Sequence, residues 1–338
     1  MVLQVIKRAL FALVIFIGIF AAWLSKATGS RPQDAPQKTF VEIERGKGVR
    51  PIARLLKEKS VISKRGPFLL EYQLFFFPRG LKAGEYQFTV PLNIKEVLHE
   101  LIEGRIFLHP LTIPEGLTAE EIAALPPLLS FGREKEFLGA FGGTEALASW
   151  DPKARNLEGY LYPETYHFAK GTTAQQIAKA MVVQFKSVFG KPWLGRANEI
   201  GMLPRDVVIV ASMIEKETSL PEEKKLVSAV FHNRLRLGMK LDCDPTIIYA
   251  LKQKKSYEGR LKYKDLKLGS PYNTYLHQGL PPGPICNPGK DSLEAALYPA
   301  KEDYLYFVSR NDGSHVFSRS FTEHQNAVRR FQKNARRK

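Results

Sequence analysis

Two glutamates close an apolar stretch of this chain, and a carboxyl group in such a place can do acid–base chemistry. The stretch is VVIVASMIEKET, residues 207–218, and the glutamates are Glu215 and Glu217. Burial disfavours the charged form of a carboxyl group and raises its pKa. A carboxylic acid that stays protonated near neutral pH can donate its proton to a leaving group.

The spacing favours Glu217 as the desolvated acid. On a helix, Glu217 continues the apolar face of Met213 and Ile214, whereas Glu215 follows Ala211 on a more polar side. In the alternative, either glutamate pairs with a nearby basic residue: Lys216, Lys224 or Arg234. Spacing alone leaves that alternative open.

Further polar residues lie in segments that are dense in aromatic residues, proline and glycine. Aromatic faces beside carboxyl and amide groups suit sugar rings, which present both CH faces and hydroxyl edges. Each segment can instead be a turn that satisfies its own backbone, as Asp and Asn often do. The candidate substrate-binding residues are Glu158, Tyr160, Asp244, Tyr272, Asn273 and Tyr275.

The motifs of metal and nucleotide sites are missing from the sequence. The seven histidines show no HxH or HExxH spacing, and there is no Walker loop or GxSxG elbow. Two cysteines, Cys243 and Cys286, are too few for a Cys-based zinc site of ordinary spacing. We therefore expect no metal and no cofactor. The sequence does not decide whether the two cysteines pair in an oxidising compartment.

The length and charge set broad limits. A chain of 338 residues is long enough for two ordinary domains. Its net charge of +16 indicates an anionic partner or surface. Charge alone does not separate nucleic acid from anionic lipid headgroups or an acidic cell-wall polymer.

An apolar segment near the N-terminus predicts export from the cytoplasm. Residues 9–24 carry no charge and follow Lys7 and Arg8. We expect residues 1–8 in the cytoplasm and a single transmembrane anchor at residues 9–25. A cleaved signal peptide is the alternative, but Ser25-Lys26-Ala27 is a poor cleavage site. With either an anchor or a signal peptide, the rest of the chain is exported from the cytoplasm. We therefore do not expect nucleic acid as a partner.

The pattern of the chain after the apolar segment predicts an α+β protein in two parts. Residues 26–38, rich in proline and polar residues, predict a linker, and residues 39–104 a small module of strands and helices. In the larger part, residues 105–338, we expect helices at 174–189, 204–218 and 221–237 and a hairpin at 304–318 that turns through Asn311-Asp312-Gly313. The segment 269–289 predicts a long loop.

Five long segments carry a resemblance to a known family. The chain resembles the endolytic murein transglycosylases, the MltG or YceG-like family, and the likeness runs from the N-terminal anchor to the C-terminus. The segments are LEGYLYPETYHF at 157–168, IEKET at 214–218, FHNRLRLGMKLDCDPTIIYAL at 231–251, YNTYLHQGLPPGPICNPG at 272–289 and AALYPAKEDYLYFV at 295–308.

The resemblance implies a fold and a place in the cell. It implies a single-pass protein of the inner membrane whose catalytic domain lies in the periplasm. Residues 39–104 would form a LysM-like module, and residues 105–338 a YceG-like catalytic domain distantly similar to lysozyme and the soluble lytic transglycosylases.

The resemblance also implies an activity. Members cleave the MurNAc–GlcNAc bond inside nascent peptidoglycan glycan strands, leave 1,6-anhydroMurNAc ends and thereby terminate strand elongation near the peptidoglycan synthases. The implied partners are glycan strands, inner-membrane lipid and those synthases. In lysozyme-like transglycosylases a small hydroxyl residue follows the catalytic glutamate, which fits Glu217-Thr218 and not Glu215-Lys216.

Two alternatives to this activity are kept open. The first is a lysozyme-like hydrolase of the same bond, with Asp244 or Glu158 as a second carboxylate. The second is a non-catalytic, peptidoglycan-binding membrane anchor. One departure from the family pattern concerns Cys243 and Cys286, which stand where relatives more often carry residues without a thiol.

Overall fold

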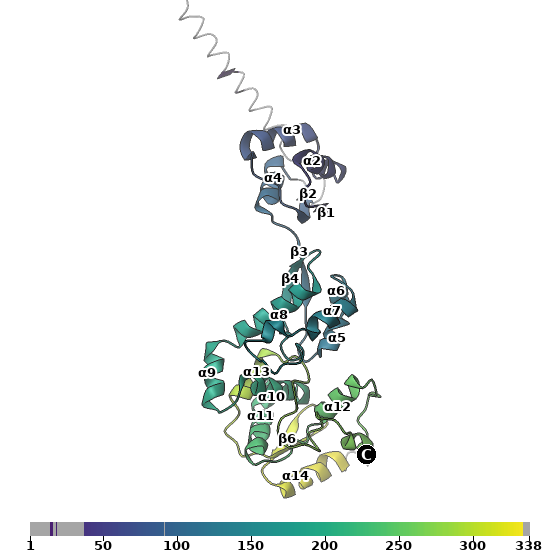
Figure 1. Cartoon of the computed structure of the whole chain (residues 1–338), viewed down its shortest axis with the longest axis vertical. Helices are drawn as coiled ribbons and strands as arrows, with labels where there is room; N and C mark the ends of the chain where they lie inside the picture. Colours follow the sequence, from purple (N-terminus) through teal and green to yellow (C-terminus); the bar gives the residue numbers. More distant parts are fainter. Residues whose placement is uncertain (1–13, 16–17, 19–36, 91, 334–338) are drawn as a thin grey trace, which may run out of the picture. The chain divides into compact units, whose positions relative to one another are not determined.

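The computed structural model describes residues 14–15, 18, 37–90 and 92–333 of the chain (Figure 1). These residues divide into two compact units. One unit runs up to His109 and includes His167–Gly171, and the other consists of Pro110–Tyr166 and the residues from Thr172 onward.

The predicted membrane anchor at residues 9–25 lies outside the described residues, apart from 14, 15 and 18. Within the described ranges, no helix combines the length and the apolar character that crossing a membrane requires. The anchor therefore stays a prediction from the sequence.

The first unit is built on two paired strands. β1 (Gln37–Ile43) runs antiparallel to β2 (Gly84–Val90). Because alternate residues of a strand point to opposite faces, Val41, Tyr86 and Phe88 lie together in the core. The helical elements that complete this core are α2 (Val49–Glu58), α3 (Arg65–Glu71), a π-helical turn at Tyr72–Phe76 and α4 (Ile94–Glu103).

The second unit is mainly helical and carries short strands, so the predicted α+β class is confirmed. β5 (Tyr306–Ser309) and β6 (His315–Ser318) form the antiparallel hairpin predicted at 304–318, and both Asn311 and Gly313 in its turn have positive φ. β3 (Leu108–Thr112) and β4 (Thr165–Ala169), which do not lie wholly in this unit, form another two-stranded sheet.

The helices near the start of the second unit are α5 (Ala119–Ala123), α6 (Pro126–Leu129), α7 (Glu134–Gly142), α8 (Ala174–Val188) and α9 (Lys191–Glu199). The later ones are α10 (Pro204–Glu217), α11 (Pro221–Arg236), α12 (Asp244–Gln253), α13 (Lys290–Leu297) and α14 (Phe321–Val328). The helices predicted at 174–189, 204–218 and 221–237 are present as α8, α10 and α11. Short helical turns lie at Glu145–Leu147, Tyr263–Lys267 and Arg329–Lys333.

α10 is the central helix of this unit. All residues from Val207 to Ile214 are buried, and the helix packs against α9, α11, α12 and α13. A helix that is apolar all round belongs in a core. Pro204 opens the helix, where a missing N–H costs nothing, and the extended Thr218 ends it. The helix therefore ends at Glu217, and the buried Thr218 turns the chain toward α11.

α12 is a helix that was not predicted from the sequence, where Asp244 was placed in a segment that could be a turn. It begins at Asp244, directly after Cys243, with Pro245 in its first turn. Proline is favoured at that position because its fixed φ suits a helix start. The segment Asp244-Pro245-Thr246 is therefore the first turn of a helix.

Candidate active site

Glu217, the last residue of α10, lies in a cavity of about 340 Å³. The cavity is bounded by the end of α10, the start of α12, strand β5 and α14. Its polar lining includes Arg234, Asp244 and Tyr275, and its aromatic lining includes Tyr306. An acid at the end of a buried helix thus faces a space large enough for part of a ligand.

Burial raises the pKa of Glu217 to about 7. A hydrogen bond with the side chain of Cys243 acts against this shift, and the negative charge of Asp244 adds to it. A carboxyl group with a pKa near 7 is protonated in about half of the molecules at neutral pH. It can therefore act both as an acid and, once ionised, as a base.

The neighbouring Glu215 has a different environment. It forms an ion pair with the buried Lys224 at 3.4 Å, and one of its oxygens accepts a hydrogen bond from the Gly289 N–H at 3.1 Å. In the described part of the chain, no lysine or arginine forms an ion pair with Glu217. The ion-pair alternative therefore holds for Glu215, and Glu217 is the glutamate that is buried without a cationic partner among the described residues.

Asp244 and Tyr275 share the cavity with Glu217. The Tyr275 hydroxyl donates a hydrogen bond of 2.7 Å to Asp244 Oδ1. Burial, followed by this hydrogen bond, raises the pKa of the Tyr275 hydroxyl, so it stays a donor. The structure thus brings together three of the predicted residues, which come from α10, α12 and the long loop.

Asn273 does not reach the cavity and instead holds the loop. Its side chain is fully buried, and Nδ2 donates to the carbonyl oxygens of Leu266 and Leu268 at 3.0 and 2.9 Å. Its Oδ1 accepts a hydrogen bond of 3.0 Å from the Tyr275 N–H. A buried amide with all these partners fixes the backbone that presents Tyr275. Contact with substrate, as predicted from sequence, does not fit this burial.

Tyr160 is likewise a core residue. Only 1% of its surface is exposed, and its hydroxyl donates to Asp151 Oδ2 at 2.6 Å. Its ring packs edge-on against Trp150 and Phe185, with ring centroids 5.5 and 5.2 Å apart. The predicted substrate contact of Tyr160 does not fit this position, because aromatic packing and burial leave no face for a sugar.

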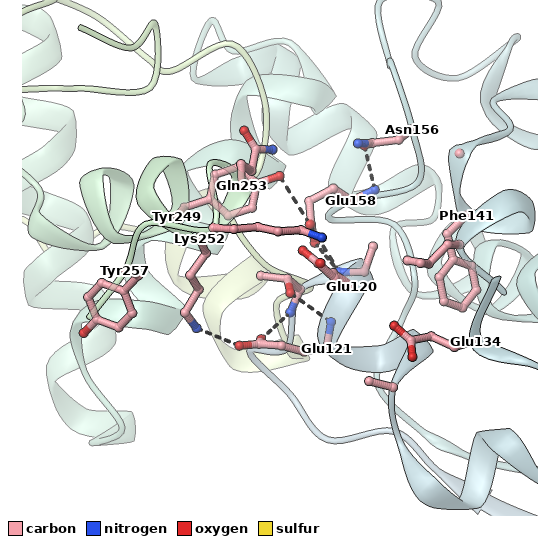
Figure 2. Close-up of a pocket in the computed structure, with 16 residues that line it drawn as sticks. Glu120, Glu121, Glu134, Phe141, Asn156, Glu158, Tyr249, Lys252, Gln253 and Tyr257 are labelled. Carbon is pink, nitrogen blue, oxygen red and sulfur yellow. Dashed lines mark hydrogen bonds and ion pairs between the residues drawn. The ribbon is translucent and has the colours of Figure 1, made fainter. Parts of the chain in front are cut away.

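Glu158 and Tyr272 lie near Tyr249, away from the Glu217 cavity. Glu158 borders a second cavity (Figure 2). It accepts hydrogen bonds from the Ala119 N–H, the Asn287 amide and the Tyr249 hydroxyl at 3.1, 3.0 and 3.3 Å. Burial raises its pKa to about 8, although these hydrogen bonds act in the opposite direction. The Tyr272 ring packs on Tyr249 at 5.0 Å between centroids.

Two residues at the Glu217 cavity have roles that sequence reasoning missed. Arg234 donates to the carbonyl oxygen of Leu305 at 2.7 Å and pairs with Asp242 at 3.0 Å, so it holds the cavity wall. Cys243 interacts with Glu217 and is a free, buried thiol, as is Cys286. The two cysteines do not form a disulfide. Among the described residues, no group of His, Cys, Asp and Glu side chains could hold a metal ion.

Fold and site together define an α+β protein whose centre of chemistry is a desolvated carboxylic acid at the end of a core helix. The model of the YceG-like family matches residues 41–330, and the chain belongs to that family. An endolytic murein transglycosylase of Bacillus subtilis (strain 168) is 32% identical over 318 residues, which are 89% of this chain and 87% of the relative.

Two further relatives support the assignment. An endolytic murein transglycosylase of Streptococcus pneumoniae (serotype 2, strain D39) is 30% identical over 88% of this chain, which spans 59% of that longer relative. The crystal structure of a YceG-like protein from Listeria monocytogenes has 33% identity and a TM-score of 0.59, covering 87% of this chain and all of that one.

Proposed function

We propose that this protein is an endolytic murein transglycosylase that cleaves the MurNAc–GlcNAc bond inside glycan strands and leaves 1,6-anhydroMurNAc ends. The observation that carries the proposal is Glu217, a carboxyl group with a pKa of about 7 in a cavity shared with Asp244 and Tyr275. The names of the relatives support the same activity.

Glu217 serves as acid and then as base. Its protonated form donates a proton to the glycosidic oxygen while the bond to C1 of the muramic acid breaks through an oxocarbenium-like state. The ionised Glu217 then accepts the proton of the C6 hydroxyl as that oxygen bonds to C1. The proton count returns to its start and no water is consumed. Acid–base catalysis of this kind contributes roughly 10²–10⁴-fold to the rate.

Asp244 and Tyr275 tune and position this chemistry. Burial chiefly raises the pKa of Glu217 and the charge of Asp244 adds to this, which keeps the acid form populated at neutral pH. The same charge favours the positive charge that develops at C1. The hydrogen bond from Tyr275 keeps the Asp244 carboxylate in one orientation.

The presence of Asp244 in the same cavity also favours one competing function, a lysozyme-like hydrolase with two carboxylates. The products separate the two. Mass spectrometry of purified peptidoglycan treated with the wild type and with Glu217→Gln is the test. Anhydro ends from the wild type alone support the transglycosylase, whereas reducing ends would identify a hydrolase.

We further propose that residues 9–25 anchor the chain in the inner membrane, with the catalytic unit in the periplasm near the peptidoglycan synthases. The uncharged segment behind Lys7 and Arg8 supports this placement. The order β1, α2, α3, β2 with paired strands supports a LysM-like module at residues 39–104. Protease digestion of intact spheroplasts tests the topology, since the proposal expects the second unit to be cut.

A further inference from the structure

A second cavity, of about 620 Å³, is lined in part by Tyr249, Lys252 and Gln253 from the later part of α12 (Figure 2). α12 starts with Asp244 in the Glu217 cavity and supplies Tyr249 and Gln253 to the second one. At about 1.5 Å of rise per residue, these positions lie about 8 and 14 Å along the helix from Asp244. One short helix therefore connects the two cavities.

The second cavity combines apolar surface with free carboxylates. Leu138 and Phe141 of α7 form an apolar wall, and Figure 2 shows Glu134 beside Phe141. Glu120 and Glu134 are exposed, and neither forms an ion pair with any residue that the structure describes. Together they give this cavity an acidic rim.

The other charges at the cavity cancel only part of this acidic rim. Lys252 is already paired with Glu121 at 2.7 Å, which leaves the exposed Lys255 as the second lysine of the lining. The rim stands out on a chain whose net charge is +16. Its two unpaired carboxylates would attract an ammonium group. A glycan without peptides offers no ammonium group, whereas a peptide with a free amine offers both an ammonium and an apolar body.

We propose that this cavity binds the stem peptide of the strand, with the side-chain ammonium of its diamino acid at Glu120 and Glu134. The inference rests on the proposed function, which makes a stem-bearing glycan the substrate. An extended peptide spans about 3.3–3.6 Å per residue, so three residues cover about 10 Å. That reach matches the separation of the two cavities along α12. Because cross-linking acylates this amine, the cavity favours strands that are not yet cross-linked.

Binding to the full-length Glu217→Gln protein tests the proposal by calorimetry. The probes are a synthetic stem tripeptide with a free side-chain amine and the same peptide acetylated on that amine. We expect the free-amine peptide to bind about three- to thirtyfold more tightly, as two partly exposed charge contacts allow. In the Glu120→Gln/Glu134→Gln double variant the ratio should fall to near one. Glu222→Gln changes an exposed glutamate of α11 and is the matched control. This variant should leave the ratio of the two affinities unchanged.

A second pair of variants tests the location. Ala124→Trp places a large ring at the cavity, whereas Leu129→Trp adds the same ring at an exposed position of α6 outside it. The proposal expects loss of peptide binding in the first variant alone. Equal binding of both peptides, or full binding to Ala124→Trp, would overturn it. So would competition by a stem-free glycan, because that would mark a sugar subsite.

The activity assay keeps this inference apart from the proposed function. Anhydro ends are measured on the wild type and report the reaction, whereas peptide binding is measured on the inactive variant and reports the cavity. Missing anhydro ends would therefore refute the proposed function. Missing amine-dependent binding would refute only the stem-peptide site.

Discussion

Replacing Glu217 by glutamine should abolish glycan cleavage and yet stabilise the fold at alkaline pH. The pKa of this carboxyl rises from 4.5 to about 7 in the folded state. Since the folded value lies above the unfolded one, the stability that the protonated form contributes is present at acid pH and is lost as the pH rises through about 7.

The magnitude follows from the two pKa values. At 1.36 kcal/mol per pKa unit, the difference corresponds to about 3.4 kcal/mol at pH values well above 7. About 0.8 kcal/mol of this is already lost at pH 5, because the unfolded carboxyl is largely ionised there. Between pH 5 and pH 8, the wild type should therefore lose about 2.5 kcal/mol that the neutral Glu217→Gln variant keeps.

The assay is urea unfolding of the wild type and the Glu217→Gln variant at pH 5 and pH 8. The matched control is Glu215→Gln. Glu215→Gln should destabilise the protein at both pH values by about 3 kcal/mol, because it leaves the buried Lys224 without its partner. If Glu217→Gln and the wild type show the same pH dependence of unfolding, Glu217 is not the desolvated acid.

The other predictions concern the residues around this acid. The wild-type rate should fall about tenfold between pH 6 and pH 8 as Glu217 ionises, and a rate independent of pH over that range would count against its role as acid. Asp244→Asn should move this fall to lower pH, because it removes a negative charge that helps to raise the pKa of Glu217. A pH–rate profile tests this, and an unchanged profile would contradict the effect of Asp244 on Glu217. Tyr275→Phe should lower the rate about tenfold with unchanged melting temperature, measured as anhydro ends released per minute. Asn273→Ala should cost about 2 kcal/mol in urea unfolding, since it leaves the Leu266 and Leu268 carbonyls without donors; a neutral result would refute its structural role.

Local signals predicted the framework of the site. Proline at the start of α10 and α11, the apolar period of residues 207–214 and the Asn-Asp-Gly turn of the hairpin all act over a few residues. They are therefore readable without the fold. The start of α12 was missed although its signal, Pro245 followed by apolar residues, is local too, because the flanking Asp and Cys residues read as a turn.

The surroundings of the polar candidates could not be predicted in the same way. Glu158 and Tyr160 stand two residues apart, yet one borders the second cavity and the other lies against Asp151 in the core. The partner of Glu158 on the long loop, Asn287, is 129 residues away. Hydrogen bonds over such separations depend on how helices and loops pack.

The sequence by itself determined that Glu217 lies on the apolar face of a helix, because a helix repeats every 3.6 residues whatever surrounds it. Only the tertiary structure decided that Glu215 finds Lys224 on the following helix while Glu217 finds Asp244 and Tyr275. Whether a carboxyl group ionises or keeps its proton depends on the charges and donors within a few ångströms of it. Those neighbours come from distant parts of the chain and meet only when it folds.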